Sequence, residues 1–324
     1  MVELEEVISH GVAHVNGIDI HYVEAGAGPA VLLLHGFPES WYSWRHQIIA
    51  LSEVGYHVVA PHQRGYGLTG GPDDVGSYNI LELVGDIVGI VNHLGVTGPV
   101  VIGHDWGAAV AWSCAQFRPD LFRAVVGMSV PHRPRSSSPP LEILRKRLGD
   151  HFYQIYFQEE GPPEADLEAD VRTSILKFLY AASGDFPTIW NPICPQGKGL
   201  FDEIELPDPA LSWLGPKDVD RFVSEFTESG FRRPLNWYRN IDYNWQITSA
   251  WQDAPILIPS LFISGDRDLI APWLASGDVH ARMLRYMPKL KAVEILKGCG
   301  HWTQQEEPQK VNRILIDFLA ELDK

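Results

Sequence analysis

The sequence of 324 residues has few cysteines: only Cys114, Cys194 and Cys299, which stand far apart. An odd number of cysteines without a Cys-x-x-Cys pair predicts neither a disulfide framework nor a zinc site. A His-Glu-x-x-His motif is also missing, and His10 and His14 fall in a segment expected to form an edge hairpin. We therefore expect no bound metal.

Basic residues are also scarce. Lys and Arg total 26 against 41 for Asp and Glu, which gives a formal net charge of −15 at pH 7. Such a charge repels phosphate backbones and anionic membrane surfaces, so neither nucleic acid nor a membrane is expected as a partner. No apolar run is long enough for a membrane-spanning helix, and the acidic start of the chain lacks the pattern of a signal peptide. These absences favour a cytoplasmic protein; for its assembly we expect a monomer or a homodimer.

A glycine-rich loop at 65–70 matches Gly-x-Gly-x-x-Gly and follows an expected strand, but turn residues rather than a helix come after it. A dinucleotide-binding loop needs a helix N-terminus at this point to hold the pyrophosphate. We therefore interpret the segment as a crossover loop and expect no cofactor.

Short, continuous apolar runs alternate along the chain with segments of helical periodicity. This pattern is typical of an α/β protein with a mostly parallel sheet that is covered by helices on both faces. The expected strands are 29–36, 56–61, 99–103, 124–130, 259–266 and 291–296, and the expected helices are 40–55, 78–94, 107–118 and 307–321.

A Pro/Ser-rich stretch at 131–140 interrupts this alternation, and an aromatic-rich, mostly helical region follows it. Strand-like runs then return. The sequence therefore predicts one α/β core, formed by residues 1–133 and 249–324, with residues 134–248 inserted as a helical cap.

The turn from 103 to 107, Gly-His-Asp-Trp-Gly, has the frame that joins a strand to a helix and exposes its central side chain. Serine is the usual central residue, and Asp105 replaces it here. Polar residues also follow later strands: the pair Asp266 and Asp268, and then His301. Ligands bind beyond the carboxyl ends of the strands in an open parallel sheet. Taken alone, Asp105 fits a helix N-cap, but nucleophile, acid and histidine in this chain order are typical of α/β-hydrolases.

An aspartate nucleophile indicates a different reaction from that of serine. The Asp105 carboxylate is ionised at pH 7 and needs no base to attack, which suits displacement at a saturated carbon and leaves an alkyl ester on the enzyme. His301 would then deprotonate the water that cleaves this ester. The oxyanion forms on Asp105 itself, where we expect the backbone N–H groups of Trp106 and Phe37 to hold it.

Two leaving groups are compatible with such a displacement. A halide leaves as a stable anion, whereas the alkoxide of an epoxide needs an acid, which a tyrosine hydroxyl supplies. Composition alone does not choose between them, because the helical insertion holds several tyrosines. They are Tyr153, Tyr156, Tyr180, Tyr238 and Tyr243.

The chain resembles, over nearly its whole length, the epoxide hydrolases of the α/β-hydrolase fold, of the soluble type found in plants and mammals. The stretches that carry the resemblance are LLHGFPESWYSWRHQI, RGYG, GHDWGA, FYQIYFQ, SGFRRPLNWYRN and GCGHWTQQEEP. The resemblance implies that Asp105 is the nucleophile, His301 the base and Asp268 its acid partner. It also implies that Tyr153 and Tyr238 reach down from the cap as the two acids.

The same resemblance implies an oxyanion hole made by Phe37 and Trp106, and a cis peptide before Pro38. The implied substrate is a small apolar epoxide, which water converts to a vicinal diol. The residues expected to line the pocket are His35, Pro38, His104 and Trp302.

Two other functions stay open. Haloalkane dehalogenases share the aspartate and the tryptophan after it, but they usually have a residue other than phenylalanine before the proline of HGFP, and they lack the tyrosine pair. A non-catalytic ligand receptor on the same fold would keep the pocket and lose part of the catalytic machinery, whereas every catalytic position is filled here.

One position departs from the pattern of the family. Members often read Asp-x-Arg-Gly-x-Gly where this chain has His62 at the first position. We interpret His62 as a structural loop residue, which affects local stability and not the reaction.

Overall fold

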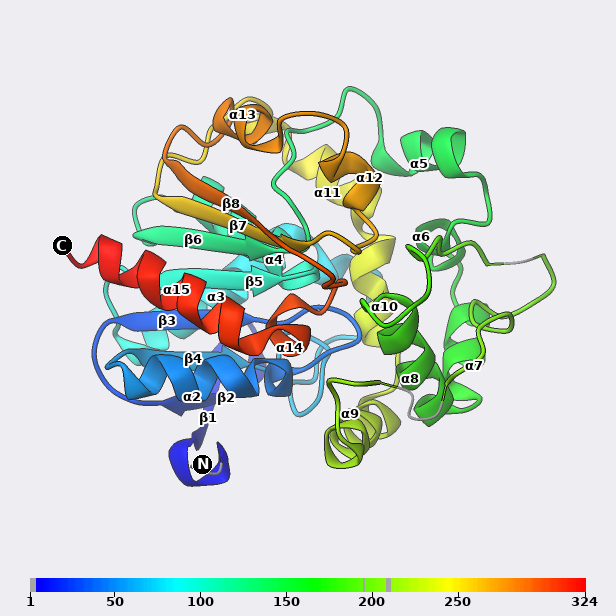
Figure 1. Ribbon diagram of the computed structural model, residues 1–324, viewed down its shortest axis with the longest axis horizontal. Coiled ribbons are helices and arrows are strands. Elements are labelled where there is room, and N and C mark those ends of the chain that lie inside the picture. Colours follow the sequence, from blue (N-terminus) through cyan, green and yellow to red (C-terminus); the bar gives the residue numbers. More distant parts are fainter. Residues whose placement is uncertain (1–3, 195, 208–210) are drawn as a thin grey trace.

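The computed structural model of the protein describes residues 4–194, 196–207 and 211–324 (Figure 1). Its sheet has eight strands in the order β1-β2-β4-β3-β5-β6-β7-β8. The pairs β1·β2 and β2·β4 are antiparallel, and every pair from β4 to β8 is parallel. The strands are β1 (Ser9–Val15), β2 (Ile18–Ala25), β3 (Ala30–Leu34), β4 (His57–Pro61), β5 (Val100–His104), β6 (Ala124–Met128), β7 (Ser260–Gly265) and β8 (Leu290–Leu296).

Helices pack on both faces of this sheet, and β3 shows why both covers are needed. All five β3 residues are buried, and successive side chains point to opposite faces. Val31 and Leu33 belong to the hydrophobic core beneath α2 (Arg45–Glu53) and α15 (Pro308–Leu322). Leu32 and Leu34 belong to the core beneath α3 (Ile80–Leu94) and α4 (Trp106–Phe117). The expected mostly parallel sheet with helices on both faces is confirmed (Figure 1).

The helices of this α/β part start close to where the sequence predicts them. The first differs slightly, because a 3-10 turn precedes the regular helix. The helical segments are α1 (Leu4–Val7), η1 (Trp41–Trp44), α2 (Arg45–Glu53), η2 (Val75–Tyr78), α3 (Ile80–Leu94), α4 (Trp106–Phe117), η3 (Ser249–Trp251), α12 (Ala271–Leu274), α13 (Val279–Leu284), α14 (Thr303–Glu306) and α15 (Pro308–Leu322).

Among the described residues, seven α-helices lie between β6 and η3 in the chain, in the region that we expected to form the cap. Figure 1 shows them gathered at one end of the sheet, beyond the carboxyl ends of the parallel strands. This arrangement places helical side chains over the edge of the sheet where ligands bind. The helices are α5 (Pro140–Leu148), α6 (Tyr153–Tyr156), α7 (Pro162–Glu168), α8 (Val171–Ala181), α9 (Pro216–Ser229), α10 (Arg232–Arg239) and α11 (Ile241–Ile247).

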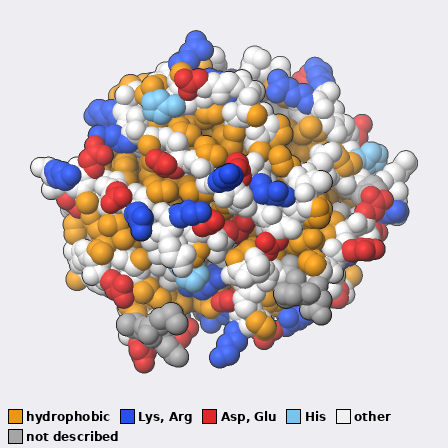
Figure 2. All heavy atoms as spheres, in the orientation of Figure 1, with side chains coloured by type: hydrophobic (Ala, Val, Ile, Leu, Met, Phe, Trp, Pro, Cys, Tyr) orange, Lys and Arg blue, Asp and Glu red, His pale blue; other side chains and the backbone are white. Residues whose placement is uncertain are grey.

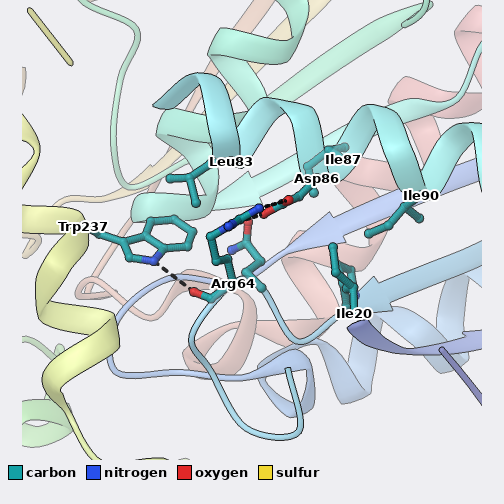
Figure 3. Close-up of a pocket in the computed structure, with 9 residues that line it drawn as sticks. Ile20, Arg64, Leu83, Asp86, Ile87, Ile90 and Trp237 are labelled. Carbon is teal, nitrogen blue, oxygen red and sulfur yellow. Dashed lines mark hydrogen bonds and ion pairs between the residues drawn. The ribbon is translucent and has the colours of Figure 1, made fainter. Parts of the chain in front are cut away.

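A buried ion pair lies where α10 meets the core (Figure 3). Arg64 forms two hydrogen bonds to Asp86, Nε to Oδ2 at 2.8 Å and Nη2 to Oδ1 at 2.6 Å. The indole N–H of Trp237, on α10, donates to the carbonyl oxygen of Arg64 at 3.0 Å. The cavity beside them has a volume of only about 10 Å³, too small for an organic substrate. We therefore regard this cluster as an anchor for α10.

Replacing Asp86 by alanine should lower the free energy of unfolding by about 3–5 kcal/mol, because the Arg64 guanidinium stays buried without its partner. Urea denaturation measures this loss. The matched control is Asp120→Ala, which removes the partner of Arg118 in an exposed ion pair and should leave the midpoint nearly unchanged. Equal losses in the two variants would show that the Arg64 pair is no anchor.

His62 lies in the loop after β4 and contacts helix α9. It is 1% exposed, its Nδ1 lies 3.1 Å from Nδ1 of His21, and its Nε2 lies 3.4 Å from Oε1 of Glu225 on α9. These contacts fit a structural role for His62. They also join this loop to α9, which the sequence did not indicate.

On the face shown in Figure 2, acidic and basic side chains are interspersed. Among the described residues, no helix is long and apolar enough to cross a membrane.

Candidate active site

Asp105 stands at a sharp turn between β5 and α4, with φ 53° and ψ −120°. A side chain at Gly103 would collide with the backbone of Gly107, and one at Gly107 would collide with the backbone of Leu34. Only glycine therefore fits at positions 103 and 107, which flank the turn. The Asp105 side chain forms no capping hydrogen bond to α4. This geometry rejects the helix-cap interpretation and leaves the carboxylate directed into the site.

The two oxygens of Asp105 have different partners. Oδ1 accepts a hydrogen bond from the backbone N–H of Phe37 at 2.9 Å, and Oδ2 lies 3.4 Å from Nε2 of His301. Burial alone would raise the pKa of Asp105, but its hydrogen bond and charge interaction with His301 and the Phe37 N–H hold that pKa below its ordinary value. The carboxylate is therefore ionised at neutral pH.

The N–H of Trp106 is the second expected oxyanion donor. Trp106 is the first residue of α4, and an N–H in the first turn of a helix has no partner within the helix. Phe37 precedes Pro38 through a cis peptide bond, as the resemblance implies. The loop after β3 thus brings the Phe37 N–H to Asp105, and the Trp106 N–H stays the second expected donor.

His301 is oriented by one of the two candidate acids. Its Nδ1 lies 2.9 Å from Oδ2 of Asp268, which is completely buried. Asp266 is exposed and accepts a hydrogen bond from the backbone N–H of Gly298 at 2.7 Å. Burial disfavours the charged imidazole, but the Asp268 and Asp105 carboxylates raise the pKa of His301 well above its usual value.

Tyr153 on α6 and Tyr238 on α10 pack edge to face, with ring centroids 5.9 Å apart and an interplanar angle of 72°. The Tyr238 ring also lies 5.1 Å from the Trp106 ring and 5.5 Å from the Phe37 ring. Burial raises the pKa of both tyrosines, and the Asp105 charge adds to the rise. Both hydroxyls therefore stay protonated and can donate a hydrogen bond to a developing alkoxide.

Two histidines that we expected to line the pocket, His35 and His104, are fully buried and bonded to protein atoms through both ring nitrogens. The Gln63 N–H donates to Nε2 of His35 at 3.1 Å, which leaves Nδ1–H of His35 to donate to the Gly36 carbonyl oxygen at 2.9 Å. Burial lowers the pKa of His35 to about 4, in agreement with a neutral ring. Both ring nitrogens of His104 are also bonded to protein atoms. The His35 and His104 side chains are fully buried, and their hydrogen bonds hold the backbone segments around Asp105 and His301 in place.

The partners of His104 include a carboxylate that sequence reasoning missed. Nδ1 of His104 lies 2.7 Å from Oε2 of Glu39, and Nε2 lies 2.7 Å from the carbonyl oxygen of His301. Burial would raise the pKa of Glu39, but the interaction with His104 lowers it below its ordinary value. Both partners of His104 are acceptor oxygens, so each ring nitrogen lies against an oxygen atom. The sequence signal that could have identified Glu39 is its position directly after His-Gly-Phe-Pro.

The other two expected lining residues directly follow residues of the proposed site in the chain: Pro38 follows Phe37, and Trp302 follows His301. Pro38 is buried and follows the cis bond. Trp302 is completely buried, its ring lies 4.9 Å from the His301 ring, and its indole N–H donates to the Leu179 carbonyl oxygen at 2.8 Å. Among the residues that the structure describes, no group of three His, Cys, Asp or Glu side chains could hold a metal ion.

Comparisons with known proteins agree with this geometry. Residues 29–308 match the family model for the alpha/beta hydrolase fold. The chain is 40% identical to epoxide hydrolase 1 of Siraitia grosvenorii, over 98% of this chain and 99% of that protein. It is 38% identical to epoxide hydrolase A of Mycobacterium tuberculosis, over 95% of this chain and 96% of that one.

Solved structures give the same result. An epoxide hydrolase from an endophytic Streptomyces superposes with a TM-score of 0.93 at 41% identity, over 98% of this chain and 97% of that one. Epoxide hydrolase A from Mycobacterium thermoresistibile superposes with a TM-score of 0.91 at 39% identity, over 97% and 98% of the two chains. The chain therefore belongs to the epoxide hydrolases of the α/β hydrolase fold.

Proposed function

We propose that the protein converts a small apolar epoxide to a vicinal diol through a covalent ester on Asp105. The observation that carries this proposal is the position of the Asp105 carboxylate. One oxygen is held by the Phe37 N–H and the other lies near His301, while two tyrosines face the site from the cap. We also propose that residues 134–248 act as that cap, and that substrate enters between the cap and the sheet.

In the first step, Oδ2 of Asp105 attacks an epoxide carbon and the carbon–oxygen bond of the ring breaks. The leaving oxygen takes a proton from Tyr153 or Tyr238, because an alkoxide is too basic to leave unaided. Oδ1 becomes the carbonyl oxygen of the ester and keeps its hydrogen bond from Phe37.

In the second step, neutral His301 removes a proton from water, and the hydroxide attacks the ester carbonyl carbon. His301 is neutral at this point because alkylation removes the Asp105 charge that helps to raise its pKa, and its proton passes to solvent. Asp268 stabilises the imidazolium that forms. Negative charge develops on Oδ1 of Asp105, where the N–H groups of Phe37 and Trp106 stabilise it. The bond from the carbonyl carbon to the alkyl oxygen then breaks. The product alkoxide and the tyrosinate from the first step then each take one proton, one from His301 and one from the new carboxyl group of Asp105.

A paired assay separates this function from its alternatives. We expect diol from an epoxide such as styrene oxide and no free halide from a bromoalkane, because the tyrosine pair serves a basic alkoxide and a halide does not need it. Product chromatography measures the diol, and an ion-selective electrode measures bromide. Bromide release without diol formation would favour a dehalogenase. Saturable epoxide binding without turnover would favour a ligand receptor.

A further inference from the structure

The backbone of the His301 loop is bonded to the end of α8, in the cap region. The N–H of His301 donates to the Ala182 carbonyl oxygen at 2.8 Å. A side chain at Gly300 would collide with the backbone of Ser183 and Gly184, so the two segments touch directly at this point. The loop that presents His301 is therefore packed against a segment more than a hundred residues away in the chain.

One carboxylate joins the same two segments. Oε2 of Glu306 accepts hydrogen bonds from the backbone N–H of Gly184 at 2.8 Å and of Gly300 at 2.9 Å, and Oε1 accepts one from Trp302 at 3.0 Å. Gly300 and Trp302 are the two neighbours of His301 in the chain. Burial raises the pKa of Glu306 to about 7, and the three N–H donors oppose this rise. The reaction described above makes no use of this carboxylate.

We infer that Glu306 is a positioning residue for hydrolysis of the ester: it ties the His301 loop to the end of α8, so that the imidazole faces the Asp105 ester while α8 is in place. This inference rests on the proposed function. Asp268 orients the His301 ring through Nδ1, but that bond does not fix the backbone from which the ring extends. Glu306 and Ala182 together hold the backbone on both sides of His301.

The two chemical steps depend differently on this support. Asp105 attacks the epoxide without a base, so a small displacement of His301 leaves ester formation nearly intact. Water activation needs His301 within hydrogen-bonding reach of the attacking water. A misplacement of about 1 Å can slow such a step by about 10²-fold. Loss of Glu306 should therefore act on hydrolysis and spare alkylation.

The test is Glu306→Gln, because glutamine retains one acceptor oxygen and turns an N–H group toward backbone N–H donors. Glu307→Gln is the matched control, since Glu307 pairs with Lys310 and not with the loop. Rapid-quench intact-mass spectrometry with enzyme in excess measures ester formation and ester decay separately. Steady-state kinetics gives kcat and KM.

For Glu306→Gln we expect ester formation within about threefold of wild type and ester decay slower by about 10 to 10²-fold. kcat and KM should then fall together while kcat/KM is kept, because kcat/KM reports only the steps up to the ester. Glu306→Asp keeps the charge on a shorter side chain and should slow decay less. Glu307→Gln should match wild type in every rate.

Two results would overturn the inference. One is ester decay at the wild-type rate in Glu306→Gln. The other is a fall of kcat and kcat/KM by the same factor at constant KM, which indicates only a smaller folded fraction. Should Glu306→Gln fail to fold, wild-type ester decay in Glu306→Asp decides against the inference in the same way. Failure of the proposed function looks different, since no variant and no wild-type sample would then form an ester.

Discussion

A His301→Gln variant should form the ester on Asp105 and then fail to hydrolyse it. Alkylation needs no base, because Asp105 is ionised, whereas water activation does need one. Loss of a general base typically slows a step by about 10²–10⁴-fold, so turnover should fall by that order. Intact-mass spectrometry should show the protein plus one substrate mass, persisting for many wild-type turnover times.

The matched control is His14→Gln, which makes the same change in an exposed side chain on β1. It should turn over like wild type and carry no adduct at the end of the reaction. A His301→Gln protein that is inactive but has an unmodified mass would contradict the assignment, because His301 would then act before the ester forms.

The Tyr153→Phe/Tyr238→Phe double variant should be nearly unable to open an epoxide. Each hydroxyl is a donor to the alkoxide, and removal of one donor of this kind costs about 10²–10³-fold in other sites. Each single variant should lose less than that, because the second hydroxyl remains. Ester formation in single turnover, followed by mass, measures the step directly.

Tyr243→Phe is the control for this pair, since Tyr243 lies in the same helical region but is 46% exposed. It should form ester at the wild-type rate. Wild-type ring opening by the double variant would show that the alkoxide takes its proton from elsewhere.

The nucleophile was predictable because its signal is local. The turn at Asp105 requires glycine at 103 and 107, and both glycines are visible in the sequence. The positions of the parallel strands in the chain were predictable for a similar reason, since buried parallel strands are continuous apolar runs. The acid was less clear. Asp266 and Asp268 are two residues apart, and only the path of the backbone decides which one reaches His301.

The supporting residues were harder to predict because their partners are distant in sequence. Glu39 bonds to His104, 65 residues away, and to Gln304, 265 residues away. Glu306 bonds to Gly184, 122 residues away. His35 and His104 were expected in the pocket wall, and sequence alone does not show which way a buried ring points. The tyrosine pair required the family resemblance, because composition does not rank five tyrosines.

The central claim is that Asp105 attacks carbon, and isotope labelling tests it most directly. One turnover is run in ¹⁸O-water with enzyme in excess over epoxide, and the diol and the peptide containing Asp105 are both analysed by mass spectrometry. If Asp105 attacks, the diol takes its new oxygen from the carboxylate and is unlabelled, while the label from water enters Asp105. If Asp105 only activates water, the diol carries the label and the peptide does not. We predict an unlabelled diol and a labelled peptide; a labelled first-turnover diol with an unlabelled peptide would contradict the account.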